Sequence, residues 1–328
     1  MSDFRSPNMT SLRLQLHPGL EVLHMPAGDV WIQRDDLIHP IVSGNKWRKL
    51  VGHLAQLKVD GKGILVTFGG AYSNHLVASA VAAQGSGLRS IGILRGEEAM
   101  QNHYLDIASG AGMQLVGVSR SLYRDKSAAL EQVLHQLDLS PENVFVVSEG
   151  GSGPLGLIGF EELVCDWINS KVKFHHVFHA SATGTTAVGL RKALDASELN
   201  MSNNAEEVIP NGVTVHSILV LKNKAEQLEF AQRHAANLNL IEGYEFGGYA
   251  RSTEALDNFV QSLSILNNIP FESIYTGKAL FAMNEWLIAQ KEMDTLQVDD
   301  ETGVFPVVFL HTGGTLNYSG VTLPVIDS

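Results

Sequence analysis

The sequence predicts an α/β fold with two open, mainly parallel sheets. Three observations support this. The 328 residues suit about two domains, short apolar runs alternate with helical patterns, and glycines gather directly after several of the runs. Short runs rich in Val and Ile are typical of strands covered on both faces. We expect strands at 63–68, 90–94, 114–118, 144–147, 176–179, 215–221 and 307–310.

Helical patterns lie between these runs. Residues 74–84 are Ala-rich and unbroken, and other segments have apolar residues at helical spacing. Polar segments at 196–212 and 291–302 are expected to be solvated insertions. The further expected helices are 46–58, 130–137, 157–169, 186–194, 228–237, 254–266 and 280–291.

Charge and cysteine content restrict the function. The chain has 23 basic and 35 acidic residues and a formal net charge of −12. This balance disfavours nucleic acid and anionic membrane surfaces as partners. The single cysteine, Cys165, cannot form an internal disulfide, which favours a reducing compartment. We find no secretory signal and no run long enough to span a membrane, so we expect a cytoplasmic protein.

The first polar cluster is Ser43-Gly44-Asn45-Lys46, at the beginning of an expected helix. The positive helix end and the neighbouring Arg48 and Lys49 are expected to lower the pKa of Lys46. A nucleophilic amine of this kind forms Schiff bases with carbonyl groups, as in enzymes that use pyridoxal phosphate (PLP). The alternative is an exposed basic first turn.

Two more clusters follow expected strands and open helices. Ser73 suits a helix N-cap, and Ser73 and Asn74 could instead face a substrate and a cofactor ring. The loop 183–186 (Thr-Gly-Thr-Thr) offers hydroxyls, backbone N–H groups and a helix dipole to a phosphate, unless it is a simple cap. The sequence has neither G-x-x-x-x-G-K-[ST] nor G-x-G-x-x-G, so a single monoester phosphate fits better than a nucleotide.

Polar residues near the C-terminus complete the set. Thr312 and Thr315 follow the last expected strand, where α/β sheets bind ligands, and either could hydrogen-bond a ring nitrogen. Tyr249 and Tyr275 lie beside glycines in short loops, where a phenol can move a proton or simply pack. The histidines of 175–179 lack neighbouring acidic or cysteine ligands, so no metal site is expected.

Six motifs in order resemble the family of aminocyclopropane-carboxylate deaminases and D-cysteine desulfhydrases, which are fold-type II PLP enzymes related to the tryptophan synthase β subunit. The resemblance runs from about Leu12 to the C-terminus. It implies a homodimer, and a smaller domain (52–160) inserted into a larger one (1–51 plus 161–328), with PLP in the cleft between them. The motifs are SGNKWRKL, GGAYSNH, EGGSGPLGLIGFEEL, ASATGTTAVGL, YTGKALFAM and HTGGT.

The resemblance also implies residue roles. Lys46 would bind PLP covalently and later move a proton. Asn74 would contact the 3-oxygen of the cofactor ring, and Thr312 or Thr315 would lie toward its nitrogen. Ser73 would lie near the substrate carboxylate. Tyr249 and Tyr275 would line the substrate side as acid or base groups. The phosphate would be held by Thr183, Gly184, Thr185 and Thr186.

Departures from the family pattern affect the expected substrate. Thr276 stands where the ring-opening deaminases have Glu, Thr312 where they have Leu, and Tyr72 where Gln is common. A neutral threonine near the ring nitrogen gives a weaker electron sink than a carboxylate. We therefore expect α,β-elimination on a small amino acid, with D-cysteine as the best candidate. The alternatives are 1-aminocyclopropane-1-carboxylate deamination, an idle ligand-binding protein on this scaffold and, more remotely, a nicotinamide oxidoreductase.

Overall fold

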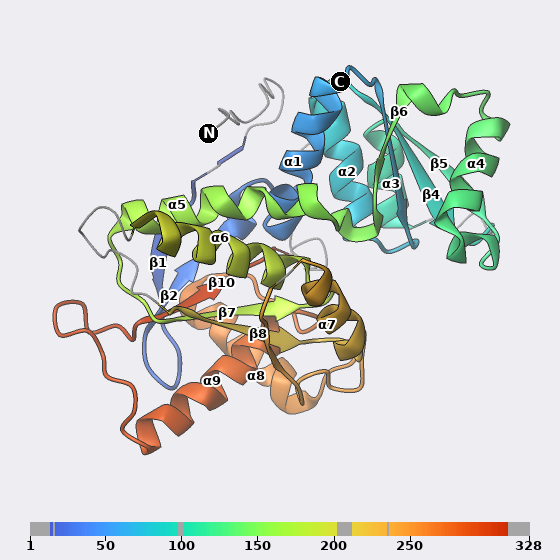
Figure 1. The fold of residues 1–328 in the computed structure, drawn as a ribbon. Coiled ribbons are helices and arrows are strands. Elements are labelled where there is room, and N and C mark those ends of the chain that lie inside the picture. Colours follow the sequence, from blue (N-terminus) through green and yellow to red (C-terminus); the bar gives the residue numbers. More distant parts are fainter. Residues whose placement is uncertain (1–13, 16, 98–101, 202–211, 235, 314–328) are drawn as a thin grey trace. The chain divides into compact units, whose positions relative to one another are not determined.

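The computed structural model describes residues 14–15, 17–97, 102–201, 212–234 and 236–313 (Figure 1). The described chain divides into two compact units. One contains Lys46–Gly159, and the other contains Gln15–Asn45 and the chain from Phe160 onward. The division expected from the sequence lay at 51/52 and 160/161, so the structure assigns Lys46 and the helix that it opens to the first unit rather than the second.

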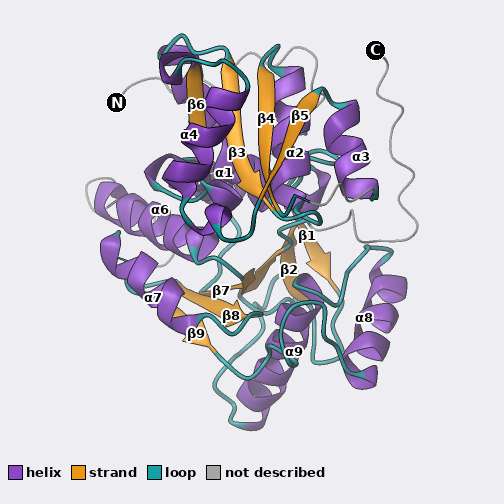
Figure 2. Ribbon diagram, turned by 90° about the vertical axis from the view of Figure 1, so that its right-hand side faces the viewer, coloured by secondary structure: helices purple, strands orange, loops and turns teal. Residues whose placement is uncertain are grey.

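The smaller unit is built on a four-stranded parallel sheet in the order β5-β4-β3-β6, visible in Figure 2. Neighbouring residues of a strand point to opposite faces of the sheet. Contacts of three successive residues of β4 show that helices cover both faces. Ile91 and Ile93 pack in a core with Val133 of α4. A Cβ on Gly92 between them would lie 2.5 Å from Leu76 of α2. The elements are α1 (Asn45–Val59), β3 (Ile64–Gly69), α2 (Asn74–Gly85), β4 (Arg89–Arg95), α3 (His103–Gly110), β5 (Met113–Val118), α4 (Lys126–Gln136) and β6 (Val144–Val147).

The larger unit is built on a six-stranded sheet in the order β1-β2-β10-β7-β8-β9. All its neighbouring strands are parallel except β1 and β2. The elements are β1 (Leu20–Leu23), β2 (Val30–Gln33), α5 (Gly159–Ser170), β7 (His176–Ser181), α6 (Thr185–Met201), β8 (Thr214–Leu219), α7 (Lys224–Arg233), β9 (Asn239–Ile241), α8 (Glu254–Asn267), α9 (Thr276–Glu292) and β10 (Val307–Leu310).

Two cores lie on opposite faces of this sheet. Val307 and Phe309 of β10 belong to the core formed with α8 and α9. Val308 and Leu310 belong to the core formed with α5 and α6. The alternation explains why the run VVFL is apolar throughout, as expected for a strand covered on both faces.

The expected fold class is confirmed: the chain is α/β with two mainly parallel sheets. All seven expected strands are present, and the structure adds β1, β2, β9 and α3. Part of the first expected insertion is helical, because α6 continues to Met201, and residues 202–211 lie outside the described chain. Within the described residues, no helix combines the length and apolar character that crossing a membrane requires.

Candidate active site

Lys46 is the second residue of α1 and is half-buried. The basic residues that follow it are not an exposed first turn: Arg48 is 0% and Lys49 is 5% exposed. Burial, and secondarily the charge of Lys46, lowers the pKa of Lys49 to about 7. The charge of Lys46 therefore acts on the Lys49 amine, which lies about one helical turn away.

The segment before Lys46 packs against the C-terminal loop within the larger unit. The Asn45 N–H donates to the Thr312 carbonyl (3.2 Å). Gly44 has a φ of +54°, and a Cβ there would lie 2.2 Å from the same carbonyl oxygen. Only glycine fits this approach. The structure thus brings together the Ser-Gly-Asn segment and the Thr312 loop, which are far apart in the sequence.

Ser73 caps α2, since its hydroxyl oxygen accepts a hydrogen bond from the Leu76 N–H (3.2 Å). The next residue, Asn74, has a buried Oδ1 that finds no hydrogen-bond partner within the described chain. His75 likewise has a buried, unpartnered Nδ1 there, while its Nε2 contacts the Thr67 hydroxyl (2.9 Å). Unpaired buried polar atoms are costly and commonly mark a ligand site.

His75 is neutral at physiological pH. Burial, followed by the charges of Lys46, Lys49 and His53, lowers its pKa to about 3. The smaller unit therefore gathers two lysines and the unpaired Asn74 and His75 atoms in one region. This is an electropositive environment with unused hydrogen-bonding capacity.

The loop 183–186 leads into α6, which has 17 residues and no acidic side chain in its first turn. Thr183 is exposed, whereas Thr185 and Thr186 are buried. The hydroxyls of Thr183 and Thr185 lie 3.3 Å apart. Gly184 has a φ of +78°, a conformation that glycine adopts without strain.

Two residues missed at the sequence level hold this loop. The Asn223 side-chain amide donates to the Ala182 carbonyl (2.6 Å). The Ser181 hydroxyl donates to Gln227 Oε1 (2.6 Å). Asn223 stands just before α7, which follows the neighbouring strand β8, and its side chain makes no capping hydrogen bond. Gln227 belongs to α7. Polar residues opening a helix next to a predicted phosphate loop are the signal that could have identified them.

The structure brings Tyr249 and Tyr275 together. Their ring centroids are 6.1 Å apart and their planes are inclined by 58°. Tyr249 is 53% exposed and Tyr275 is half-buried. Two phenols from different loops thus form one pair in the larger unit. Tyr72, in the smaller unit, is also exposed and contacts the ring of Tyr104.

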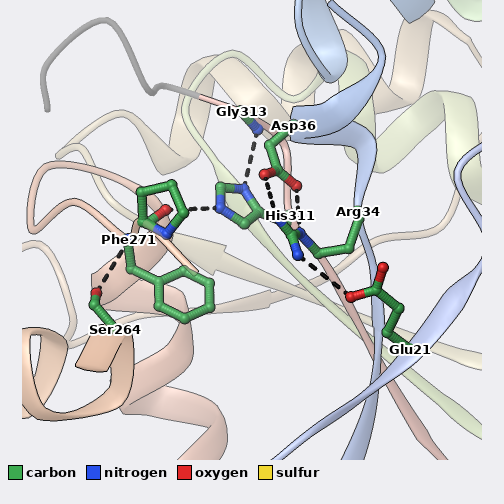
Figure 3. A network of polar contacts seen from close by, with 8 residues as sticks. Glu21, Arg34, Asp36, Ser264, Phe271, His311 and Gly313 are labelled. Carbon is green, nitrogen blue, oxygen red and sulfur yellow. Dashed lines mark hydrogen bonds and ion pairs between the residues drawn. The ribbon is translucent and has the colours of Figure 1, made fainter. Parts of the chain in front are cut away.

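Thr312 is buried, and the preceding residue, His311, is fixed by contacts on both sides of its ring. Figure 3 shows the contacts of His311. His311 Nδ1 accepts a hydrogen bond from the Gly313 N–H (3.3 Å), so its Nε2 donates to the Pro270 carbonyl (3.1 Å). The ring stacks on Phe271 with centroids 5.2 Å apart. Thr315 lies outside the described residues.

The adjacent strand end is also held by buried polar contacts (Figure 3). Arg34 follows β2 and makes two hydrogen bonds of 2.9 Å to Asp36. A third, of 3.3 Å, reaches Glu21. These contacts hold the segment that follows β2 against β1.

The histidines of β7 pair with β8 instead of forming a metal cluster. His176 Nδ1 lies 3.1 Å from His216 Nε2, and His179 Nε2 lies 2.9 Å from the Ser217 hydroxyl. Within the ranges that the structure describes, no three His, Cys, Asp or Glu side chains are grouped to hold a metal.

Comparison with known proteins identifies the class. A family model described as "Pyridoxal-phosphate dependent enzyme" matches residues 14–313, and the chain belongs to this family of PLP-dependent enzymes. A protein of Pyrococcus horikoshii named "Putative 1-aminocyclopropane-1-carboxylate deaminase" is 29% identical over 92% of this chain and 90% of its own length. A protein of the same name from Pyrococcus abyssi is 27% identical over 87% of this chain and 84% of its own.

Solved structures of other proteins resemble this chain in fold. An ACC deaminase homologue superimposes with a TM-score of 0.67 at 27% identity, covering 92% of both chains. Cysteine synthase of Entamoeba histolytica shares the fold, with a TM-score of 0.62 at 13% identity. The match covers 95% of this chain and 87% of the synthase chain. Serine racemase of Dictyostelium discoideum also shares the fold, with a TM-score of 0.62 at 11% identity. The match covers 94% of this chain and 93% of the racemase chain.

The chain's own residues fit PLP. The unpaired Asn74 side chain suits a ring oxygen, because its amide can present either oxygen or nitrogen. The hydroxyls and helix N-terminus at 183–186 suit a phosphate monoester. Lys46 supplies a half-buried amine. The family assignment decides between PLP chemistry and the two alternatives of another class, a nicotinamide oxidoreductase and an idle binding protein, in favour of PLP chemistry.

Proposed function

We propose that this enzyme is a deaminating lyase that acts on D-cysteine. The reaction is an α,β-elimination in which D-cysteine and water give pyruvate, ammonia and sulfide. PLP, when bound, supplies an electron sink for the negative charge left at Cα. The chain's own side chains would bind the substrate, orient it and move its protons.

The observation that carries this choice is the state of Thr276. Its side chain is fully buried, and its hydroxyl donates to Glu272 Oε1 (2.9 Å). Position 276 therefore supplies no carboxylate of its own, in contrast to the Glu of the ring-opening deaminases that the sequence resembles. This favours elimination of a good leaving group such as thiolate over opening of a cyclopropane ring.

Each remaining residue has a role in the proposal. Lys46 binds the cofactor covalently and takes the Cα proton. The Ser73 oxygen already accepts from Leu76, so its O–H proton is available to a substrate carboxylate. Tyr249 and Tyr275 donate a proton to the departing sulfur. Asn74, Thr312 and the loop 183–186 hold the cofactor.

Product analysis tests the reaction. We expect D-cysteine to give equimolar pyruvate, ammonia and sulfide, and L-cysteine, D-serine and L-serine to react more slowly. The names of the Pyrococcus relatives favour a second candidate, 1-aminocyclopropane-1-carboxylate deaminase, which would give 2-oxobutyrate and ammonia instead. Efficient release of 2-oxobutyrate without sulfide formation from D-cysteine would decide for that candidate.

Substitution of Lys46 tests the site. Lys46→Ala removes the amine, so we expect loss of the visible absorbance of covalently bound PLP and a fall in activity of at least about 1000-fold, as is typical when a covalent catalyst is removed. Lys58→Ala is the matched control, because Lys58 is exposed in the last turn of the same helix. Unchanged absorbance in Lys46→Ala would show that another lysine binds the cofactor.

A further inference from the structure

Glu272 is a buried carboxylate just before α9, and it holds the backbone around Tyr275. Its Oε2 accepts the N–H of Ile274 (2.5 Å) and of Tyr275 (2.8 Å). Its Oε1 accepts the N–H of Thr276 (2.7 Å), in addition to the Thr276 hydroxyl. One side chain thus satisfies three consecutive N–H groups leading into α9. Those of Tyr275, the N-cap, and Thr276, the first residue of α9, would otherwise have no partner in the helix.

Gly277, which follows Thr276, allows Glu272 to pack closely against the first turn of α9. Gly277 donates its N–H to the Glu272 carbonyl (2.8 Å). A Cβ on Gly277 would lie 2.6 Å from that carbonyl oxygen and 2.5 Å from Val260 Cγ2. Any larger residue would push Glu272 and α8 away from α9. The backbone of Tyr275 is therefore fixed by its hydrogen bond to Glu272 and by the close approach of Gly277 to Glu272 and Val260.

Lys278 holds the loop that carries Tyr249. Its side chain is fully buried, and its ammonium donates to the carbonyls of Glu245 (2.8 Å) and Gly248 (2.9 Å). This loop has a strained backbone: Phe246 and Ala250 have φ of +49° and +52°, although neither is glycine. Such conformations persist only where other contacts enforce them.

The two charges also act on each other. Burial raises the pKa of Glu272, opposed by the hydrogen bonds it accepts from Thr276, Tyr275 and Ile274. Burial lowers the pKa of Lys278, opposed by the charges of Glu272 and Glu245. A buried charge is costly when its opposite charge is removed, so the effects of the two side chains should not be independent.

We propose that Glu272 and Lys278 are positioning residues that hold the phenols of Tyr275 and Tyr249 as a pair on the substrate side of the site. The inference rests on the proposed function only for the catalytic role of the two phenols. Fixing both rings from α9 and the residues just before it keeps them within reach of one substrate atom. Small misplacement of such groups greatly slows a reaction.

Fluorine NMR of protein labelled with 3-fluorotyrosine measures the positions directly. The signals of Tyr249 and Tyr275 are assigned with Tyr→Phe variants of the holoenzyme. We expect Glu272→Gln to shift the Tyr275 signal most and Lys278→Met to shift the Tyr249 signal most. Two substitutions on α9 are the controls: Glu285→Gln, which removes the charge of the group that accepts from the Tyr244 hydroxyl, and Lys291→Met, which loses a contact to the Ala27 carbonyl.

Kinetics on the best substrate of the product analysis supplies the second measurement. We expect Glu272→Gln and Lys278→Met to lower kcat by roughly 10- to 100-fold with a smaller change in KM, since geometry rather than binding is lost. Glu272→Asp keeps the charge and should recover part of kcat. The fall in the double variant should differ from the product of the two single falls.

Several outcomes separate the hypotheses. The inference is overturned if the labelled signals and kcat of Glu272→Gln and Lys278→Met match those of the two controls. If those variants do not fold, Thr276→Val and Lys278→Arg replace them; an unmoved Tyr275 signal in the first and an unmoved Tyr249 signal in the second would equally overturn it. If the wild type turns over no amino acid while the signals move as expected, the proposed function fails and the positioning of the pair stands.

Discussion

His216 is a buried residue that makes the stability of the fold depend on pH. Its ring stacks on Phe178 with centroids 4.2 Å apart and contacts His176. Burial lowers the pKa of His216 to about 3 and that of His176 to about 4. Both are lower than the value of about 6.5 for an unfolded chain, so folding favours the neutral rings. Their stabilisation is complete above pH 6.5 and is lost as the pH falls toward 4.

As the pH falls below 6.5, each such histidine should lower the free energy of unfolding by up to about 1.4 kcal/mol per pH unit. His216→Gln removes one of them, so its free energy of unfolding should fall less between pH 7 and pH 5 than that of the wild type, by up to about 2 kcal/mol. Urea titrations at several pH values measure this. The exposed His175→Gln is the control, and equal slopes in wild type and His216→Gln would contradict the assignment.

The residues that we propose to face the ligand could be named from the sequence, whereas the residues that support them could not. Lys46, Asn74 and the loop 183–186 stand in Gly-rich polar clusters after apolar runs, where parallel sheets bind ligands. Glu272 and Lys278 act on backbone groups that their types do not specify, and Lys278 reaches a carbonyl 33 residues away. Nothing in the local pattern marks such a contact before the fold is known.

At the scale of elements, the strands with continuous apolar runs were predictable because both faces are covered. The others depend on pairing with neighbours. β1 is exposed at two of its four residues, and β9 has only three residues. Segments this short and this exposed do not stand out from loops, so the partner strand rather than the local sequence defines them.

The turn into α6 supports a prediction about cofactor affinity. Gly184→Ala places an L-residue at a φ of +78°, which costs about 1–2 kcal/mol, and the turn should rearrange to relieve it. We therefore expect PLP to bind the apoenzyme up to about tenfold more weakly, measured by titration of the visible absorbance.

The matched control for this loop is Gly61→Ala in the turn after α1. Gly61 has a similar φ of +65° and no atom within 4 Å of a Cβ, so the backbone cost is comparable and no contact is disturbed. Gly61→Ala should lower stability without changing PLP affinity. Equal PLP affinity in wild type and Gly184→Ala would show that the 183–186 loop does not hold the phosphate.

For the whole molecule, we predict the homodimer that the family resemblance implies. Light scattering of the holoenzyme should give about twice the 35.6 kDa of one chain at all concentrations that permit activity. A stable, active species with the mass of one chain would contradict this. The measurement also decides whether kinetic effects of surface substitutions must be interpreted per chain or per dimer.

The position of β10 has a consequence for biosynthesis. This strand is the last in the described chain, yet it lies in the middle of its sheet, between β2 and β7. The ribosome therefore delivers the neighbours of the gap long before the strand that fills it, and the half-made sheet has two unpaired inner edges. The four-stranded sheet has no such delay, because its strands all lie between Ile64 and Val147. Nascent chains stalled before residue 305 should protect the first sheet from protease while the second remains cleavable.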